Sequence, residues 1–293
     1  MSSLPPVQGP DGRQLGVAEW GDPAGRPVFS LHGTPGSRLR RPPNEDPLRA
    51  AGLRVLMYDR PGYGASDRHR GRSVVDCVAD VEAIADSLGL TQFHVIGGSG
   101  GGPHALAVGA RMPDRVLGVE AFVSPAPRDR IEFDFLAGMD PENVQEFGWA
   151  LESEEVLHRE LTREAAQFLG QFEDESAAVL GEVDFGEADR ELMARDDVRR
   201  SMGEMVREAF RNGVWGWVDD DLAMLEPWGF DLDEIAVPVT IRYGSQDVLV
   251  PAAHGEWLGR HVPGARVVVD DSGGHMIAPE EMLEIMVALV GGR

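Results

Sequence analysis

The sequence contains no lysine, and all 27 of its basic residues are arginine. This absence excludes a Schiff-base lysine, and with it the usual pyridoxal phosphate and aldolase chemistry. It also excludes the phosphate-binding P-loop, whose motif requires a lysine. The 50 acidic residues leave a formal net charge of −23. Because phosphate backbones would repel such a chain, we expect no nucleic-acid partner.

Cysteine and long apolar runs are also scarce. The single cysteine, Cys77, excludes an internal disulfide and fits a reducing compartment. No apolar run approaches the roughly 18 to 20 residues that a membrane span needs, and the N-terminus lacks the pattern of a signal peptide. We therefore expect a cytoplasmic protein, a monomer or a homodimer, with no membrane partner.

Short apolar runs alternate with helical patterns through residues 1–127 and again after residue 235. Because strands joined by helical crossovers pair in parallel, this alternation predicts an α/β fold with a mostly parallel, doubly wound sheet. Residues 13–23 are expected to form an antiparallel edge strand. The buried strands are predicted at 27–33, 53–59, 93–99, 116–124, 237–244 and 265–272.

The segment 128–234 has a different character. Its apolar residues recur at helical spacing, and it holds 30 of the 50 acidic residues but only 10 of the 27 arginines. We therefore predict an α/β core built from residues 1–127 and 235–293. Residues 128–234 are predicted to form a separate, helical and strongly acidic unit inserted between the two parts.

Ser99 lies in "GGSGG" at 97–101, directly after a predicted buried strand and before a helical pattern. In that context G-x-S-x-G is a nucleophile elbow, which lifts a serine above the sheet in strained backbone geometry. The same region also fits the dinucleotide fingerprint G-x-G-x-x-A, with Glu120 as the ribose-binding acid. Glu120 falls in the middle of a predicted strand, however, and the motif does not follow the first strand of the domain. The nucleophile interpretation is therefore preferred.

A serine hydroxyl needs a base, and the base needs an acid that orients it. On a sheet of this kind the chain order is serine, acid, histidine. Asp247 and His275 both follow predicted strands, in loops expected at the same edge of the sheet as Ser99. We therefore predict a catalytic triad of Ser99, Asp247 and His275. The alternative acids are Asp270, Asp271 and Glu120.

The glycines and the proline of "LHGTPGSR" at 31–38 bend the backbone after a predicted strand, so that amide groups can point into the site. The amides of Thr34 and Gly100 are predicted to bind the negative charge that develops on a substrate carbonyl. Three further residues are predicted to border the substrate, namely His32, Gly33 and His104.

Five motifs stand in the order and at the spacing of the α/β-hydrolase superfamily. They are "LHGTPGSR", "YDRPGYGASD", "VIGGSGGGPHALA", "YGSQDVLVP" and "GGH". The chain most resembles the capped serine hydrolases that include proline iminopeptidases, esterases and carbon–carbon bond hydrolases. The resemblance implies that residues 128–234 are a cap, inserted after the sixth strand, that roofs the active site. It also implies a structural role for Asp59 and Arg60.

Two departures from this family bear on the substrate. "HGTPG" stands where proline iminopeptidases typically have "HGGPG", and Gly100 stands where a bulkier residue is common, which would widen the pocket. Aromatic residues of the cap are expected to line an apolar acyl or leaving-group pocket. They are Phe147, Trp149, Trp215, Trp217 and Trp228, of which Trp149, Trp215 and Trp217 are the preferred substrate contacts.

These observations predict a serine hydrolase, without cofactor or metal, that cleaves a small carboxylic ester, lactone or amide through an acyl-enzyme. Its partner would be a small molecule with an apolar acyl part. A proline iminopeptidase-like aminopeptidase is one alternative, because acidic residues of the cap could bind an ammonium group. The candidates are Glu152, Glu154, Glu155 and Glu204. An alternative of another class is a ligand receptor on the same fold with little turnover.

Overall fold

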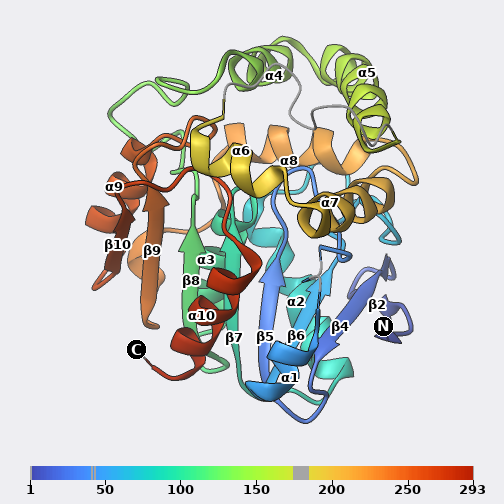
Figure 1. Ribbon diagram of the computed structural model, residues 1–293, viewed down its shortest axis with the longest axis vertical. Coiled ribbons are helices and arrows are strands. Elements are labelled where there is room, and N and C mark those ends of the chain that lie inside the picture. Colours follow the sequence, from blue (N-terminus) through green and yellow to red (C-terminus); the bar gives the residue numbers. More distant parts are fainter. Residues whose placement is uncertain (1, 41, 43, 174–184, 293) are drawn as a thin grey trace.

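The computed structural model describes residues 2–40, 42, 44–173 and 185–292. Its main sheet has the strand order β1-β4-β6-β5-β7-β8-β9-β10 (Figure 1). Each pair of neighbouring strands in the series β6-β5-β7-β8-β9-β10 is parallel. Strand β4 pairs antiparallel with both β6 and β1. The predicted mostly parallel sheet is therefore confirmed. Its strands are β1 (Ser2–Ser3), β4 (Val17–Gly21), β5 (Arg26–Leu31), β6 (Leu53–Tyr58), β7 (Phe93–Gly98), β8 (Val116–Phe122), β9 (Val239–Gly244) and β10 (Arg266–Asp270).

The first residues of the chain add two features that the sequence pattern did not indicate. The predicted edge strand corresponds to β4, but β4 is not at the edge, because β1 pairs with it on the outer side. A separate two-stranded antiparallel sheet is formed by β2 (Val7–Gln8) and β3 (Gln14–Leu15). Both corrections involve strands of two residues, which are too short to produce a visible alternation of apolar residues.

Helices cover both faces of the sheet. On β6, Leu56 and Tyr58 point to one face and Val55 and Met57 to the other, as alternation along a strand requires. The first face is covered by α2 (Cys77–Ser87), α3 (Gly101–Arg111) and α9 (Ala252–His261), and the second by α1 (Asp46–Ala50) and α10 (Pro279–Val290). In Figure 1, α1 and α10 lie in front of the sheet.

The start of α2 shows how the local sequence sets an element boundary. A short 3-10 helix, Val74–Asp76, precedes α2, and a capping box links Ser73, the residue before it, to its last residue, Asp76. Ser73 is the cap residue, and its backbone N–H donates to the Asp76 carboxylate at 2.6 Å. This reciprocal arrangement satisfies amide groups that the first turn leaves without partners.

A group of helices between β8 and β9 lies over the carboxyl ends of the parallel strands (Figure 1). In chain order β8 is the sixth strand of the main sheet. The helices are α4 (Pro141–Glu152), α5 (Glu154–Glu173), α6 (Glu187–Met193), α7 (Asp196–Ala209) and α8 (Trp215–Leu225), followed by the 3-10 helix Leu232–Glu234. We call α4 to α8 the cap helices.

The cap helices pack around an apolar cluster of their own. Leu157 and Leu161 on α5, Val206 on α7 and Val218 on α8 are all fully buried in it. Tyr63, from the loop after β6, joins the same cluster and ties it to the sheet. In the described part of the chain, no helix is both long enough and apolar enough to cross a membrane.

Candidate active site

Ser99 stands at the turn between β7 and α3 with a backbone φ of +53°. A left-handed conformation is uncommon for a residue other than glycine and costs about 1 to 3 kcal/mol. Two glycines permit the turn. A Cβ atom on Gly97 would lie 2.2 Å from the Gly101 carbonyl oxygen, and one on Gly101 would lie 2.2 Å from the Leu31 carbonyl oxygen. Helix α3 therefore approaches β7 at Gly97 and β5 at Gly101 too closely for a side chain at either position.

His275 and Asp247 are brought together by the loops after β10 and β9. The His275 Nδ1 atom lies 2.8 Å from the Asp247 carboxylate, which also accepts the backbone N–H groups of Leu249 and Val250, each at 2.9 Å. A carboxylate on Nδ1 fixes the tautomer in which Nε2 is free to take a proton.

Ser99 and His275 line the same cavity. Among the described side chains, no hydrogen bond links the Ser99 hydroxyl to the His275 ring. In ligand-free sites such bonds are often long and shorten only when substrate binds.

Asp189 supports the His275 loop from α6, and the sequence analysis did not identify it. Its buried carboxylate accepts the backbone N–H groups of His275, at 2.8 Å, and Met276, at 2.9 Å. A Cβ atom on Gly274 would lie 2.3 Å from this carboxylate, so glycine is needed there. Burial lowers the pKa of His275, but the carboxylates of Asp247 and Asp189 outweigh it and raise that pKa above its ordinary value.

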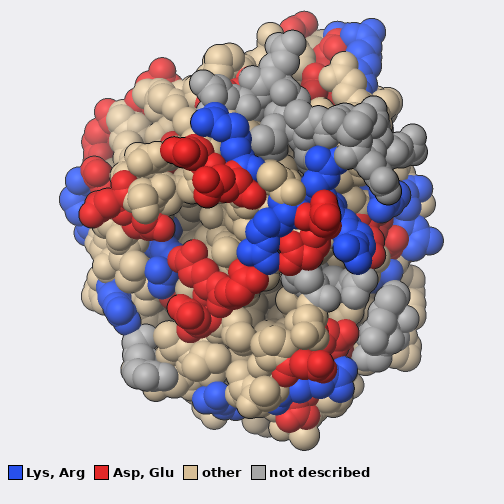
Figure 2. Space-filling model, viewed as in Figure 1, with Lys and Arg blue, Asp and Glu red and all other residues tan. Residues whose placement is uncertain are grey.

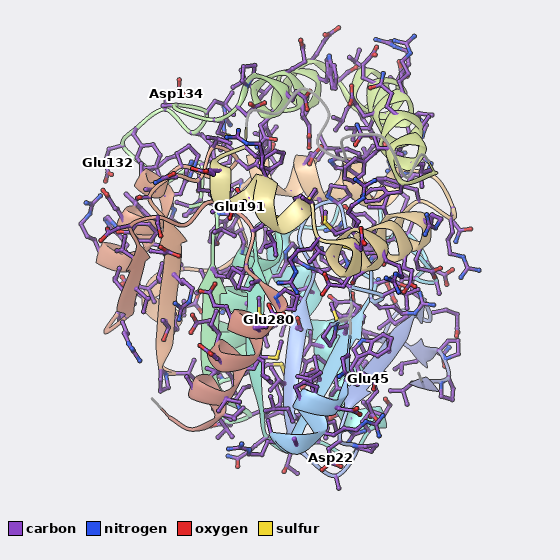
Figure 3. The ribbon with its side chains drawn as sticks, in the orientation of Figure 1. Asp22, Glu45, Glu132, Asp134, Glu191 and Glu280 are labelled. Carbon is purple, nitrogen blue, oxygen red and sulfur yellow. The ribbon has the colours of Figure 1, made fainter. Side chains whose placement is uncertain are left out.

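We expect the pH profile of kcat/KM to report this raised pKa. His275 must be neutral to accept a proton, so activity falls on the acid side with a midpoint above pH 6.5, the ordinary value for histidine. Asp189→Asn removes one negative charge beside the loop and moves the midpoint to lower pH. Glu191→Gln, an exposed position on the same helix that is labelled in Figure 3, leaves the midpoint unchanged. Equal midpoints for wild type and Asp189→Asn would contradict the assignment.

The amides of Thr34 and Gly100 lie side by side. A Cβ atom on Gly100 would be 3.2 Å from the Thr34 nitrogen. Within the described residues neither amide donates a hydrogen bond, so both are available to a substrate oxygen. The same Cβ atom would lie 2.2 Å from the Thr34 hydroxyl. The expectation that Gly100 widens the pocket is therefore wrong, because the Thr34 side chain already fills that space.

Asp220, on α8, anchors the Thr34 side chain. Its carboxylate accepts the Thr34 hydroxyl at 2.6 Å and the Tyr63 hydroxyl at 3.0 Å, and it pairs with Arg60 and Arg72 at 2.5 Å each. The side chains of Asp220, Arg60 and Arg72 are 0, 1 and 3% exposed. Burial raises the pKa of Asp220, but the two guanidinium groups outweigh it and hold that pKa well below its ordinary value.

Arg60 extends this network to the backbone of the loop. Its guanidinium donates to the His32 carbonyl and, at 2.9 Å, to the Gly33 carbonyl. Its own backbone N–H donates to the His32 ring at 3.1 Å. Thr34 is therefore held through its side chain, and the two residues before it are held through their carbonyl groups. Asp220 neutralises the charge of Arg60, and Arg60 in turn holds the loop that carries Thr34. A cap helix, α8, therefore fixes the geometry of that loop.

The cavity above Ser99 and His275 has a volume of about 1140 Å³. Figure 2 shows the face that it opens on, hollowed near its centre between acidic side chains. Glu280, labelled in Figure 3 at the start of α10, is one of the acidic residues on its rim. The predicted residues His32, Gly33, Thr34, Trp149 and Trp217 are among those that line the cavity.

Two residues predicted to border the substrate lie elsewhere. Trp215 stacks on His158, with ring centroids 3.9 Å apart, and under Arg68, beside a separate surface pocket. His104 is fully buried, and its Nδ1 atom is 2.8 Å from the Gly100 carbonyl oxygen. Burial, followed by the charge of Arg60, lowers the pKa of His104 to about 3, so it is neutral at ordinary pH.

Among the described residues, four carboxylates of the cap helices line the cavity, namely those of Glu142, Glu146, Glu164 and Asp197. Glu146 accepts the Trp217 indole N–H at 2.7 Å, and its pKa is raised to about 7 by burial and by its acidic neighbours. The sequence analysis named other glutamates of the same segment. Of these, Glu154 instead pairs with Arg68 and Arg70 at the surface. Helical spacing alone does not tell which acidic residue faces inward.

Comparisons with known proteins agree with this architecture. The alpha/beta hydrolase fold family model matches residues 26–281. A proline iminopeptidase of Xylella fastidiosa (strain Temecula1) is 25% identical, over 94% of this chain and 92% of that protein. An esterase from Exiguobacterium antarcticum superposes with a TM-score of 0.71 at 20% identity, covering 99% of this chain and all of the other. An enol-lactonase from Burkholderia xenovorans LB400 superposes with a TM-score of 0.66 at 22% identity, covering 98% of each chain. At these identities the two structures show a shared fold alone.

Proposed function

We propose that this chain, which belongs to the alpha/beta hydrolase family, is a serine hydrolase that cleaves a carboxylic ester, lactone or amide. The observation that carries the proposal is the bond of 2.8 Å between His275 and Asp247 beside a cavity that Ser99 also lines. The left-handed backbone at Ser99 supports it, because nucleophile elbows use this strain to present the hydroxyl.

In the first half of the reaction, His275 Nε2 takes the proton of the Ser99 hydroxyl while Oγ attacks the carbonyl carbon of the substrate. The carbonyl oxygen becomes an oxyanion and accepts the amides of Thr34 and Gly100. Asp247 keeps the ring oriented and stabilises its positive charge. When the tetrahedral intermediate collapses, the bond to the leaving group breaks and that group takes the proton from Nε2, which leaves an acyl-enzyme on Ser99.

Water completes the cycle by the same path. His275 removes a proton from a water molecule that attacks the acyl carbon, and the oxyanion again lies against Thr34 and Gly100. Collapse of this second intermediate returns the proton to Ser99 Oγ and releases the carboxylic acid. Side chains and backbone amides carry every step, so the proposal requires no cofactor.

We further propose that residues 128–234 act as the cap of this site and that residues 1–127 and 235–293 form its catalytic core. The lining of the cavity supports this division. Ser99 and His275 come from the core, whereas Glu146 and Trp217 come from the cap helices. The cap then determines which substrates reach the nucleophile, while the core supplies the chemistry.

Labelling with a fluorophosphonate tests the proposal directly. We expect one probe per chain, with the adduct located at Ser99 by mass spectrometry, because an activated serine attacks the phosphorus as it would a carbonyl. Ser99→Ala and His275→Ala abolish the label, while Ser124→Ala, a buried serine near the elbow, retains it. If the folded wild-type protein is not labelled, the proposal is wrong, and a ligand receptor with little turnover becomes the preferred function.

An aminopeptidase is the second candidate, favoured by Glu142, Glu146 and Glu164 in the cavity. Carboxylates in a partly closed cavity attract an ammonium group. If the protein is an aminopeptidase, it hydrolyses proline 4-nitroanilide. Glu146→Gln then raises the KM for proline 4-nitroanilide and leaves the KM for a neutral ester unchanged. Glu152→Gln, on the exposed side of the same helix, changes neither constant. Fast turnover of neutral esters with none of proline 4-nitroanilide would remove this candidate.

A further inference from the structure

Part of the cavity lies deeper than the catalytic groups, along the face of the sheet that α1 and α10 cover. This part begins at Phe122, the last residue of β8, beside Gly98, and below it the lining consists of Trp20 on β4, Val55 and Met57 on β6 and Met286 on α10. Each of them is at most 6% exposed. We call this set of five side chains the apolar floor.

Strand geometry explains why these side chains meet. Val55 and Met57 are two residues apart on β6, so they point to the same face, and Trp20 lies opposite Val55 in the register of β4 and β6. Val55 is three residues before the end of β6 at Tyr58. At about 3.3 Å per residue, the floor therefore reaches about 10 Å below the carboxyl edge of the sheet.

The helices above the floor leave it uncovered in part. Helix α1 has only 5 residues and is about 7.5 Å long at 1.5 Å per residue. It contributes Leu48 to the lining, and α10 contributes Met282 and Met286, which are one turn apart. Methionine side chains are flexible and adapt to the shape of an apolar ligand.

Most polar groups of the cavity lie away from the floor, although Ser30 of β5 and Arg40 also line the cavity. The exposed residues Asn44, Glu280 and Glu284 stand at its rim, and carboxylates such as Glu146 belong to the cap helices. The floor has neither charge nor amide side chain. A ligand that spans the cavity would therefore place an apolar chain on the floor and its polar part toward the cap or the rim.

We propose that the apolar floor binds the acyl chain of the substrate, and that the substrates are esters of straight-chain acids of medium length. A depth of about 10 Å accommodates about eight carbons, since bonds of 1.5 Å advance an extended chain by roughly 1.25 Å per carbon. This inference rests on the proposed function, because the chain must begin at the acyl carbon that Ser99 attacks. The cap aromatics were expected to line an acyl or a leaving-group pocket, and this inference leaves them only the leaving-group side.

A series of 4-nitrophenyl esters from acetate to dodecanoate tests the inference. We expect kcat/KM to rise from acetate to octanoate by up to about fourfold per methylene, the ratio that corresponds to burial of one methylene. The gain ends at about eight to ten carbons, where the floor is full. The same order is expected for the rate at which alkyl fluorophosphonates of increasing length label Ser99.

Variants in the floor shift this profile. Val55→Phe fills the deep end and moves the optimum to shorter chains, whereas Met286→Ala opens space and moves it to longer chains. Leu289→Ala is the matched control, because Leu289 packs on the same helix but does not belong to the lining among the described residues. Circular dichroism identifies any variant that fails to fold, and either folded floor variant is sufficient for the test.

The outcomes separate this inference from the function on which it rests. A profile that is flat or falls from acetate onward, with Ser99 still labelled, overturns the acyl-chain inference and leaves the serine hydrolase standing. The acyl-chain inference is also overturned if neither floor variant changes the chain length at which kcat/KM is highest. If folded wild-type protein neither labels nor turns over any ester, both the inference and the proposed function fail.

Discussion

We expect the Ser99→Ala variant to lose turnover of a neutral ester by about 10⁴- to 10⁶-fold in kcat, the range seen when a nucleophile that acts with a base is removed. The variant still folds, because alanine is smaller than serine and leaves the packing around the turn between β7 and α3 unchanged. Binding of the substrate is retained, so KM changes much less than kcat. Steady-state kinetics measure the loss, and Ser124→Ala serves as the control.

The proposed triad is also expected to behave as a unit. His275→Ala is expected to cost a similar factor, and the double variant Ser99→Ala/His275→Ala is expected to be no slower than either single variant. The base has nothing to activate once the nucleophile is gone. Additive losses, or a Ser99→Ala variant within tenfold of wild type, would show that another group performs the chemistry.

The Asp220→Asn variant is expected to be less stable by about 3 to 5 kcal/mol, the cost of leaving buried charges without their partner. Arg60 and Arg72 lose the carboxylate between them, and neither guanidinium is exposed to water. Urea denaturation measures the change in the free energy of unfolding. Asp129→Asn, which breaks a more exposed ion pair with Arg130, is expected to change stability by less than about 1 kcal/mol.

The folded fraction of Asp220→Asn is expected to be a poor catalyst as well. Asparagine keeps one acceptor oxygen but not the charge and the second oxygen that Thr34, Arg60 and Arg72 share. The loop that carries Thr34 is then no longer held, its amide no longer lies where the oxyanion develops, and kcat falls about tenfold or more while KM changes little. The decisive measurement is kcat per folded molecule. If Asp220 has only a structural role, the variant contains less folded enzyme, but kcat per folded molecule and KM are both unchanged. Unchanged stability and kcat would refute the assignment of Asp220 as a positioning residue.

The elbow and the sheet could be predicted because their signals are local. Ser99 is surrounded within a few residues by the glycines that the turn needs, and each parallel strand is a short apolar run. That Ser99, Asp247 and His275 lie near one another could be expected from the sheet, because the loops after parallel strands meet at the same edge. These predictions need no knowledge of which distant residues touch.

Residues whose role depends on distant contacts could not be found in this way. Asp220 reaches Thr34 across 186 positions of the chain, and it stands between two other acidic residues that suggest a solvated surface. A signal was nevertheless present, because apolar residues precede and follow the three acids of α8, which indicates a buried helix whose acids need partners.

The error at Trp215 has a geometric cause. Trp215 and Trp217 are two residues apart on α8, and at about 100° per residue their side chains point about 200° apart. Only one of the two can face the cavity, and it is Trp217. Helical periodicity therefore excluded one tryptophan from the start, although it did not say which.

The position of Asp220 also limits how this enzyme can be recombined with its relatives. The proposed cap, residues 128–234, is continuous in sequence, so exchanging it for the corresponding segment of another hydrolase would be a simple construction. Such a chimaera would inherit Arg60 and Arg72 from the recipient without the carboxylate that neutralises them. A donor segment without an acidic residue at the position of Asp220 would yield an insoluble or inactive chimaera. Any exchanged segment must therefore carry an acidic residue at that position.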